Sequence, residues 1–262
     1  LASHKAAARQ AVELSRIQQI SDYEFYLEFQ PQVSTRTGLC TGCEALMRAR
    51  DSQGTVHSPW EFLQWLAQAR LMPDVDLWVA SQAVRQYQKW QKIGFALPMT
   101  INISSATLTH AGYGERLVEI LAQACGQISV EITEDALVGD VQATRQTIQR
   151  LQAIGAKVYI DDFGTGFSAL SYLHQFPVDF IKIDRSFVVA QRDPKGAQVL
   201  TGMLRFCEAL NLGVVVEGVE TAEQLAFLNT GTELFIQGWY FSKALPGDLL
   251  PGFVRRRAAA QA

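Results

Sequence analysis

From Pro98 onward the chain alternates short apolar segments with amphipathic ones, and this alternation constrains the fold more than any other feature. Short apolar runs bounded by Gly, Pro or Asp predict strands, and the segments between them have the residue spacing of helices. The predicted strands lie at residues 25–29, 43–47, 99–103, 128–132, 158 onward, 180–184, 213–217 and 234–237. Nearly continuous apolar strands separated by helices are typical of a parallel sheet. We therefore expect an α/β fold, a (β/α)8 barrel of the TIM type, with a doubly wound open sheet as the alternative.

Caps and prolines predict where the elements begin and end. The first strand should end before Pro31, because proline cannot donate to a strand ladder. Capping boxes, N-caps and prolines predict helices that begin at Ser58–Glu61, after Pro73, at Asp140, at Asp193–Pro194, at Thr221–Gln224 and at Pro246, and a further helix is expected over residues 117–125. The tryptophans of the second helix, Trp78 and Trp90, are expected in the core.

The composition is that of one large soluble domain. Of the 262 residues 48% are hydrophobic, which is enough for a sizeable core. A formal net charge of −3 without a long Lys or Arg run argues against DNA binding. No apolar run approaches the roughly 20 residues that span a bilayer, and no signal peptide is visible, so we expect a cytoplasmic location with no membrane segment in this fragment. Cys40 and Cys43 lack the partners of a zinc site, so reduced thiols are expected.

Residues 1–20 are rich in Ala, Gln and Arg and have apolar residues loosely at helical spacing. We interpret them as a linker helix from an upstream domain into the main domain, residues 21–262, with a tag-proximal tail as the alternative. The first residue is Leu1 rather than Met, which favours a fragment of a longer protein that could be membrane-anchored.

The stretch VYIDDFGTG, residues 158–166, predicts a reactive surface at the end of a buried strand. Neighbouring side chains on a strand point to opposite faces, so Asp161 and Asp162 can share a site only if Asp162 lies past the strand end. Adjacent carboxylates repel each other unless a proton or cations neutralise them. The stretch is therefore either a proton-sharing pair or a two-metal site.

Polar residues interrupt or follow most of the predicted strands. They are Glu44, Asn102, Glu131, Asp161, Asp162, Lys182, Asp184, Glu217 and Gln237. In a barrel the carboxyl ends of the strands meet at one mouth, and buried carboxylates are costly unless cations collect them. All the candidate ligands are oxygen donors, which favours Mg²⁺ or Mn²⁺ over zinc. Lys182 and Arg48 could each hold a phosphate oxygen.

Ordered sequence blocks resemble a known family. They are Glu44-Ala45-Leu46 with Arg48, Asn102-Ile103-Ser104, Glu131-Ile132-Thr133-Glu134, DDFGTGFSAL from Asp161, KIDRSFV from Lys182, EGVET from Glu217 and QGWYFSK from Gln237. Together these blocks are similar to the EAL domain family of bacterial cyclic di-GMP phosphodiesterases, over roughly Phe25 to Pro246.

The resemblance implies a barrel, often with a reversed first strand, that hydrolyses cyclic di-GMP to linear pGpG. It implies metal ligands at Glu44, Asn102, Glu131, Asp161 and Asp162, catalytic roles for Lys182, Glu217, Asp184, Gln237, Glu134 and Glu220, and substrate contacts at Gln30, Pro31, Leu46 and Arg48. In this assignment Lys182 would polarise the attacking water, and Glu134 would brace the loop after Asp162.

We therefore expect a phosphodiesterase that uses two Mg²⁺ or Mn²⁺ ions for in-line attack by water, with Ca²⁺ binding and inhibiting. A catalytically silent cyclic di-GMP receptor is the first alternative, and a Mg²⁺-dependent barrel lyase is the second. The resemblance also implies a homodimer and an upstream sensory or GGDEF-type domain.

Overall fold

The computed structural model describes residues 23–166 and 173–261. The predicted linker helix over residues 1–20 lies outside the described residues, as does the end of the DDFGTGFSAL block. Eight of the described strands form a closed barrel. They are β1 (Glu24–Ser34), β2 (Cys40–Arg50), β4 (Met99–Asn102), β5 (Ile128–Thr133), β6 (Val158–Phe163), β7 (Phe180–Ile183), β8 (Gly213–Val216) and β9 (Phe235–Ile236).

The strand order confirms the predicted barrel and its reversed first strand. Neighbours from β2 through β4, β5, β6, β7 and β8 to β9 are parallel. β1 closes the barrel by pairing antiparallel with β2 on one side and with β9 on the other. Two short strands lie outside the barrel: β3 (Val56–His57) pairs with β2, and β10 (Leu245–Pro246) pairs with β1.

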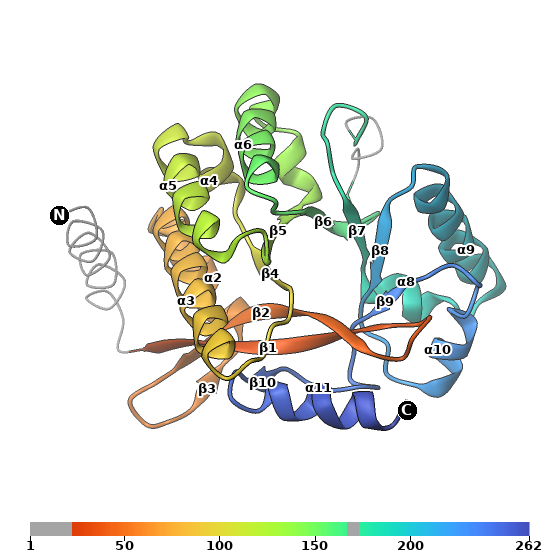
Figure 1. Cartoon of the computed structure of the whole chain (residues 1–262). Helices are drawn as coiled ribbons and strands as arrows, with labels where there is room; N and C mark the ends of the chain where they lie inside the picture. The colour runs from red at the N-terminus through yellow and green to blue at the C-terminus, as the bar shows by residue number, and fades with distance from the viewer. Residues whose placement is uncertain (1–22, 167–172, 262) are drawn as a thin grey trace.

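The helices of the described residues lie around the outside of the strands (Figure 1). They are α2 (Pro59–Gln68), α3 (Met72–Lys92), α4 (Ser105–Thr109), α5 (Ala111–Leu121), α6 (Val141–Ala153), α8 (Arg185–Ala190), α9 (Pro194–Ala209), α10 (Ala222–Phe227) and α11 (Leu250–Ala259), with short 3-10 turns η1 (Ala122–Ala124) and η2 (Glu134–Leu137). The core fills the space between helices and strands. The predicted core residues Trp78 and Trp90 are buried there, and the ring centroid of Trp90 lies 5.1 Å from that of Phe29. None of the helices in the described ranges has the length and apolar character needed to cross a membrane.

The predicted caps are present. Thr221 and Gln224 exchange hydrogen bonds at the start of α10, Asp140 accepts one from the Ala143 amide at the start of α6, and Asp193 caps α9. Each cap satisfies amide groups that have no partner within the helix. These three helix starts were therefore readable from the sequence.

Pro31 does not end β1, contrary to the prediction. The strand runs on to Ser34, and Pro31 pairs with Cys43 of β2. The Cys43 amide donates to the Pro98 carbonyl, on the side of β2 away from β1. Pro31 and Cys43 are therefore a pair without mutual hydrogen bonds, and the missing N–H of Pro31 leaves no acceptor on β2 unpaired. The other edge of β1 has partners only near Phe29 and Val33, so the ring displaces no neighbour there.

Two predicted helix starts were also wrong. The last helix begins at Leu250 instead of Pro246, because Pro246 pairs with β1 in β10 and Pro251 takes the first turn of α11. Helix α5 begins at Ala111, before the predicted 117. Gly112 and Gly114 weaken the helical pattern in the first turn of α5, so the sequence does not indicate where the helix begins. Gly114 is buried, and a Cβ there would lie 3.0 Å from the Thr147 hydroxyl oxygen.

Candidate active site

Lys182 lies at the centre of the barrel mouth, and carboxylates from four other strands or strand ends converge on its ammonium. Its Nζ is 2.5 Å from Glu131, 2.6 Å from Glu217, 3.2 Å from Asp161 and 3.3 Å from Glu44. The side chains of Lys182 and Glu131 are almost completely buried. A barrel brings these residues together because alternate residues of each strand face inward and the carboxyl ends meet.

Glu44, like Lys182, contacts several other residues of the site. Its Oε1 accepts a hydrogen bond from Asn102 Nδ2 at 2.6 Å, and its Oε2 accepts one from Gln237 Nε2 at 2.5 Å. Gln237 in turn accepts a hydrogen bond from Gln32 at 2.9 Å. The residues predicted on β2, β4 and after β9 therefore meet at one carboxylate.

The charges in this cluster do not balance, and the pKa values reflect the imbalance. Burial opposes the charge of Lys182, but the surrounding carboxylates outweigh it and raise the Lys182 pKa well above its usual value. Burial and the charge of Glu44 raise the Glu131 pKa, and burial with Glu44 and Asp161 raises the Glu217 pKa to about 7. Burial also opposes the charge of Glu44, but Lys182 and two amide donors lower its pKa. One ammonium is too little for these four carboxylates.

Two buried carboxylate oxygens of the cluster make no hydrogen bond to the described part of the chain. They are Glu131 Oε1 and Asp161 Oδ1, and the latter faces Lys182 Nζ in poor hydrogen-bonding geometry. Buried anionic oxygens without donors are costly, and they suit a hard cation. Within residues 23–166 and 173–261, no three Asp, Glu, His or Cys side chains are grouped as a ready-made metal site. The Lys182 ammonium lies where the carboxylates converge. The donor chemistry fits Mg²⁺ or Mn²⁺, although the arrangement is not a preformed cage.

We predicted that Asp162 lies past the end of the strand, but it lies within β6. Its φ of +54° is left-handed, and the pairing with β7 shifts register between Ile160 and Phe163. This irregularity has the effect that we expected of a turn, because it changes the direction of the Asp162 side chain from that of a regular strand. Burial and the charges of Asp161 and Asp184 raise the Asp162 pKa, so the three carboxylates lie within electrostatic range.

Three further predicted residues lie around the cluster. Glu134 accepts hydrogen bonds from the Gly164 and Gly166 amides, at 3.2 and 3.3 Å, and so contacts the loop after Asp162. Asp184 caps α8 by accepting from the Ser186 amide. Glu220 pairs with Arg185 at 3.0 Å.

The predicted substrate residues lie along the β1–β2 ladder. Gln30 is opposite Glu44, and its side chain lies 3.4 Å from Gln237. Leu46 is half-buried one step further along. Arg48 is already engaged, because its Nε donates to Glu28 at 3.0 Å. Pro31 is buried and lies on the face of β1 opposite to Gln30, so it is not brought to the mouth with the others.

Sequence reasoning missed two polar residues of β1. Glu28 pairs with Arg48, and Gln32 holds Gln237. Both alternate with Gln30 along one face of the strand, and this period of two was the signal that could have found them.

A closed barrel with one reversed strand and a carboxylate cluster at its carboxyl mouth defines the class of protein. The family model for the EAL domain matches residues 12–244. The chain therefore belongs to the EAL domain family.

Curated relatives include the cyclic di-GMP phosphodiesterase PdeR of Escherichia coli, 33% identical over 89% of this chain and 36% of PdeR. The cyclic di-GMP phosphodiesterase NbdA of Pseudomonas aeruginosa is 36% identical over 91% of this chain and 31% of NbdA. The chain thus spans about a third of the length of these relatives. Among solved structures, a PaMucR phosphodiesterase in complex with c-di-GMP has a TM-score of 0.81 and 30% identity, covering 92% of this chain and 99% of that one.

Proposed function

We propose that this chain is a metal-dependent phosphodiesterase that hydrolyses cyclic di-GMP to linear pGpG. The observation that carries the proposal is the convergence of Glu44, Glu131, Asp161 and Glu217 on buried Lys182, with two carboxylate oxygens left without a hydrogen bond. The relatives named as cyclic di-GMP phosphodiesterases support the choice of substrate.

Two divalent cations, Mg²⁺ or Mn²⁺, would be held by Glu44, Asn102, Glu131, Asp161 and Asp162. When bound, such ions supply an activated water and neutralise charge on the phosphodiester. The charge of Lys182 and the two amide donors lower the pKa of Glu44 and so favour its ionised form, which is suited to a cation ligand. Asp184 and Glu217 would assist from beside the cluster.

Lys182 would polarise the attacking water and stabilise charge on the phosphoryl oxygens. Its raised pKa keeps the ammonium protonated at neutral pH, and its burial makes that charge act at full strength. Glu134 would hold the loop after Asp162, since it accepts from two amides of that loop.

The substrate would lie along the β1–β2 side of the mouth. Arg48 would hold a phosphate oxygen, Gln30 would contact the nucleotide, and Leu46 would give a base an apolar wall. In this arrangement the Arg48 guanidinium must share or leave Glu28 when the substrate binds.

The direct test is incubation of the metal-free protein with cyclic di-GMP, followed by chromatography for pGpG. Mg²⁺ or Mn²⁺ should restore hydrolysis, whereas Ca²⁺, which prefers longer bonds and more ligands, should suppress it. Glu44→Ala and Asp161→Ala should each lower turnover by roughly a hundredfold or more, as loss of a ligand would. Glu119→Ala, an exposed carboxylate on α5, is the matched control. Activity in excess chelator would refute the metal mechanism, and binding without cleavage would favour the receptor alternative.

We also propose, from the family resemblance, a homodimer, a cytoplasmic location and an upstream sensory or GGDEF-type domain in the full-length protein. Cys40, Cys43, Cys125 and Cys207 are free thiols, which is consistent with a reducing compartment. Sedimentation of the purified chain over a range of concentrations tests the dimer.

A further inference from the structure

A second cavity lies inside the barrel, at the end opposite the candidate active site. Its volume is about 360 Å³. Residues at the amino-terminal ends of the strands form its rim, among them Thr41, Pro98, Gln127 and Lys157. In most barrels of this kind layers of side chains fill the interior. Here the layer at this end leaves a space.

The cavity lies one side-chain layer below the catalytic cluster. Thr100, Ser129, Tyr159 and Phe180 line it, and each stands two residues before a member of the predicted site. Residues two apart on a strand face the same way, so these side chains face the barrel interior. Gln32 also lines the cavity, and it donates to Gln237 of the cluster. Gln32 therefore belongs both to the cavity lining and to the hydrogen-bond network of the cluster.

Small residues on one side and a large ring on the other shape this space. Gly42 lines the cavity where other strands present side chains, and a Cβ there would lie 3.2 Å from Gln32 Oε1. At Gly213 a Cβ would lie 2.2 Å from the Phe180 ring, so only glycine lets this ring take its position.

One wall is aromatic and ends at a cation. Phe180 stacks on Tyr159 with ring centroids 4.4 Å apart and planes inclined by 12°, and Phe235 lies 5.8 Å from Phe180. The Lys157 ammonium lies 5.1 Å from the Phe180 ring centroid, at the rim. Flat ring faces suit a planar ligand, and the exposed ammonium suits an anionic substituent on it.

The opposite wall holds a buried hydroxyl without a partner. Thr100 is only 3% exposed, and its Oγ1 makes no hydrogen bond to the described chain. A buried hydroxyl without a partner is costly, so a ligand that offers a hydrogen-bonding atom would be stabilised there. This hydroxyl is an observation independent of the aromatic wall, and it favours a ligand that carries a polar atom.

We propose that this cavity is a second ligand site, which takes a small planar aromatic monoanion. The ring would lie against Phe180, its anionic group would meet Lys157 at the rim, and a hydrogen-bonding atom would reach Thr100. The site differs from the proposed catalytic site in its position and in its charge, since a cation lines it instead of carboxylates.

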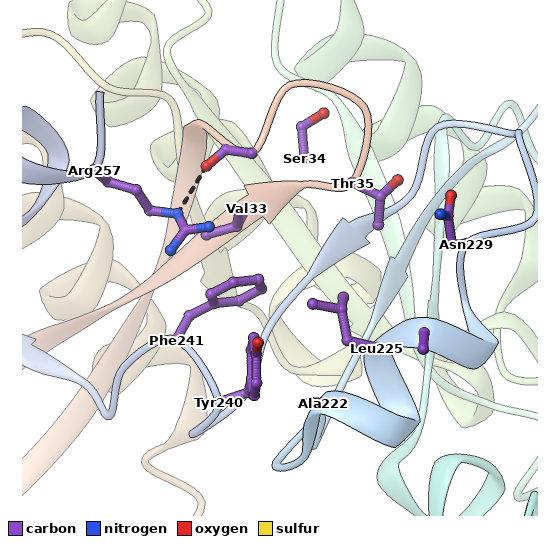
Figure 2. A pocket seen from close by; sticks show the side chains of 11 residues that line it. Val33, Ser34, Thr35, Ala222, Leu225, Asn229, Tyr240, Phe241 and Arg257 are labelled. Carbon is purple, nitrogen blue, oxygen red and sulfur yellow. Dashed lines mark hydrogen bonds between the residues drawn. The ribbon is translucent and has the colours of Figure 1, made fainter. Parts of the chain in front are cut away.

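A larger cavity, of about 410 Å³, lies outside the barrel beside α10 and α11 (Figure 2). Its cation is already engaged, because the Arg257 guanidinium donates a hydrogen bond to the Gly38 carbonyl. No buried polar atom without a partner lines it among the described residues. We therefore place the ligand site in the barrel interior.

The test uses 2-naphthoate as the probe and its neutral amide, 2-naphthamide, as the charge control. Saturation-transfer NMR and calorimetry on the whole chain measure binding. Lys157→Gln should weaken naphthoate binding by about tenfold, the value of a charge-assisted contact, and leave naphthamide unchanged. Thr100→Val, which keeps the side-chain shape, should weaken the binding of both probes. Lys195→Gln, an exposed lysine on α9, should change neither.

Cyclic di-GMP separates this site from the mouth, because it should not displace the probe. Unfolding midpoints within a few degrees of the wild type show that the variants are folded. The proposal is overturned if naphthoate does not bind at millimolar concentration, if all three variants bind it equally, or if a crystal soaked with the probe has only water in the cavity.

Discussion

Lys182 is a buried cation whose removal should affect stability and chemistry separately. Its ammonium forms ion pairs with four carboxylates of the cluster, those of Glu44, Glu131, Asp161 and Glu217. Loss of one partner from a buried ionic cluster leaves the others uncompensated. A divalent cation is the natural replacement for that lost charge.

Lys182→Met should therefore lower the free energy of unfolding by about 3–5 kcal/mol in chelator, and Mg²⁺ should recover part of the loss. It should also lower kcat on the order of a hundredfold, with little change in cyclic di-GMP affinity. Urea unfolding and steady-state kinetics measure the two effects, with Lys195→Met as control. Unchanged kcat with raised KM would assign Lys182 to binding.

The ion pair between Arg48 and Glu28 predicts that substitutions of its two residues change cyclic di-GMP affinity in opposite directions. Arg48→Ala should weaken cyclic di-GMP binding by about tenfold and reduce its salt dependence, because a charge-assisted phosphate contact is lost. Glu28→Gln should tighten binding, because the competing carboxylate is gone. Glu24→Gln, which breaks the neighbouring pair with Arg50, should have no effect. Titrations at two salt concentrations check this, and weaker binding by Glu28→Gln would mean that Glu28 orients Arg48.

At the scale of elements, one buried carboxylate joins two helices. Asp76 of α3 accepts hydrogen bonds from the Ser104 amide and hydroxyl and from the Thr107 hydroxyl, and so holds the start of α4. Burial is the main influence on this carboxyl, and it raises the Asp76 pKa to about 6. The folded chain therefore binds this proton more tightly than the unfolded chain does.

The contribution of Asp76 to stability should fall as pH rises from about 4 to about 6, since the carboxyl ionises first in the unfolded chain. The shift from 3.8 to about 6 corresponds to about 3 kcal/mol. Asp76→Asn should remove this part of the pH dependence. Urea unfolding at a series of pH values measures it, and the exposed Asp248→Asn variant should retain the wild-type profile. Parallel profiles for Asp76→Asn and the wild type would contradict the prediction.

Local chemistry decided which elements could be predicted. The starts of α6, α9 and α10 were readable because a side chain makes the cap itself. The predicted strand and helix ends that were wrong depended on tertiary contacts. Pro31 stays in β1 only because its neighbours leave that edge open, and Pro246 is a strand residue only because β1 lies beside it. No local pattern carries such information.

At the scale of the whole molecule, the barrel is closed without residues 1–20. β1 begins at Glu24 and pairs with β2 along its length, and later with β9. We expect deletion of residues 1–20 to change the free energy of unfolding by no more than about 0.5 kcal/mol, because all the strands of the closed barrel lie after them in the sequence. Urea unfolding of the two chains measures this. A loss of several kcal/mol would move the domain boundary toward residue 12, where the family match begins.

The sequence predicts which residues meet in the candidate site, but not the detailed positions of their side chains. Barrel topology alone brings Glu44, Glu131 and Asp161 to one mouth, so their convergence followed from the strand pattern. The position of Lys182 among them and the left-handed backbone of Asp162 depend on three-dimensional packing. The pairing of Arg48 with Glu28 required the register of two antiparallel strands, which the sequence does not specify.

The reversed direction of β1 decides where mechanical force enters the barrel. Glu24, near its start, is opposite Arg50, and the next rungs carry Arg48, Leu46 and Glu44 in turn. A pull or twist on the chain at Tyr23 would therefore travel along this ladder to the side chains that we propose contact the substrate and the metal ions. If β1 ran parallel to β2, the same force would act on the opposite end of the barrel and would reach the mouth only through the full length of the strand.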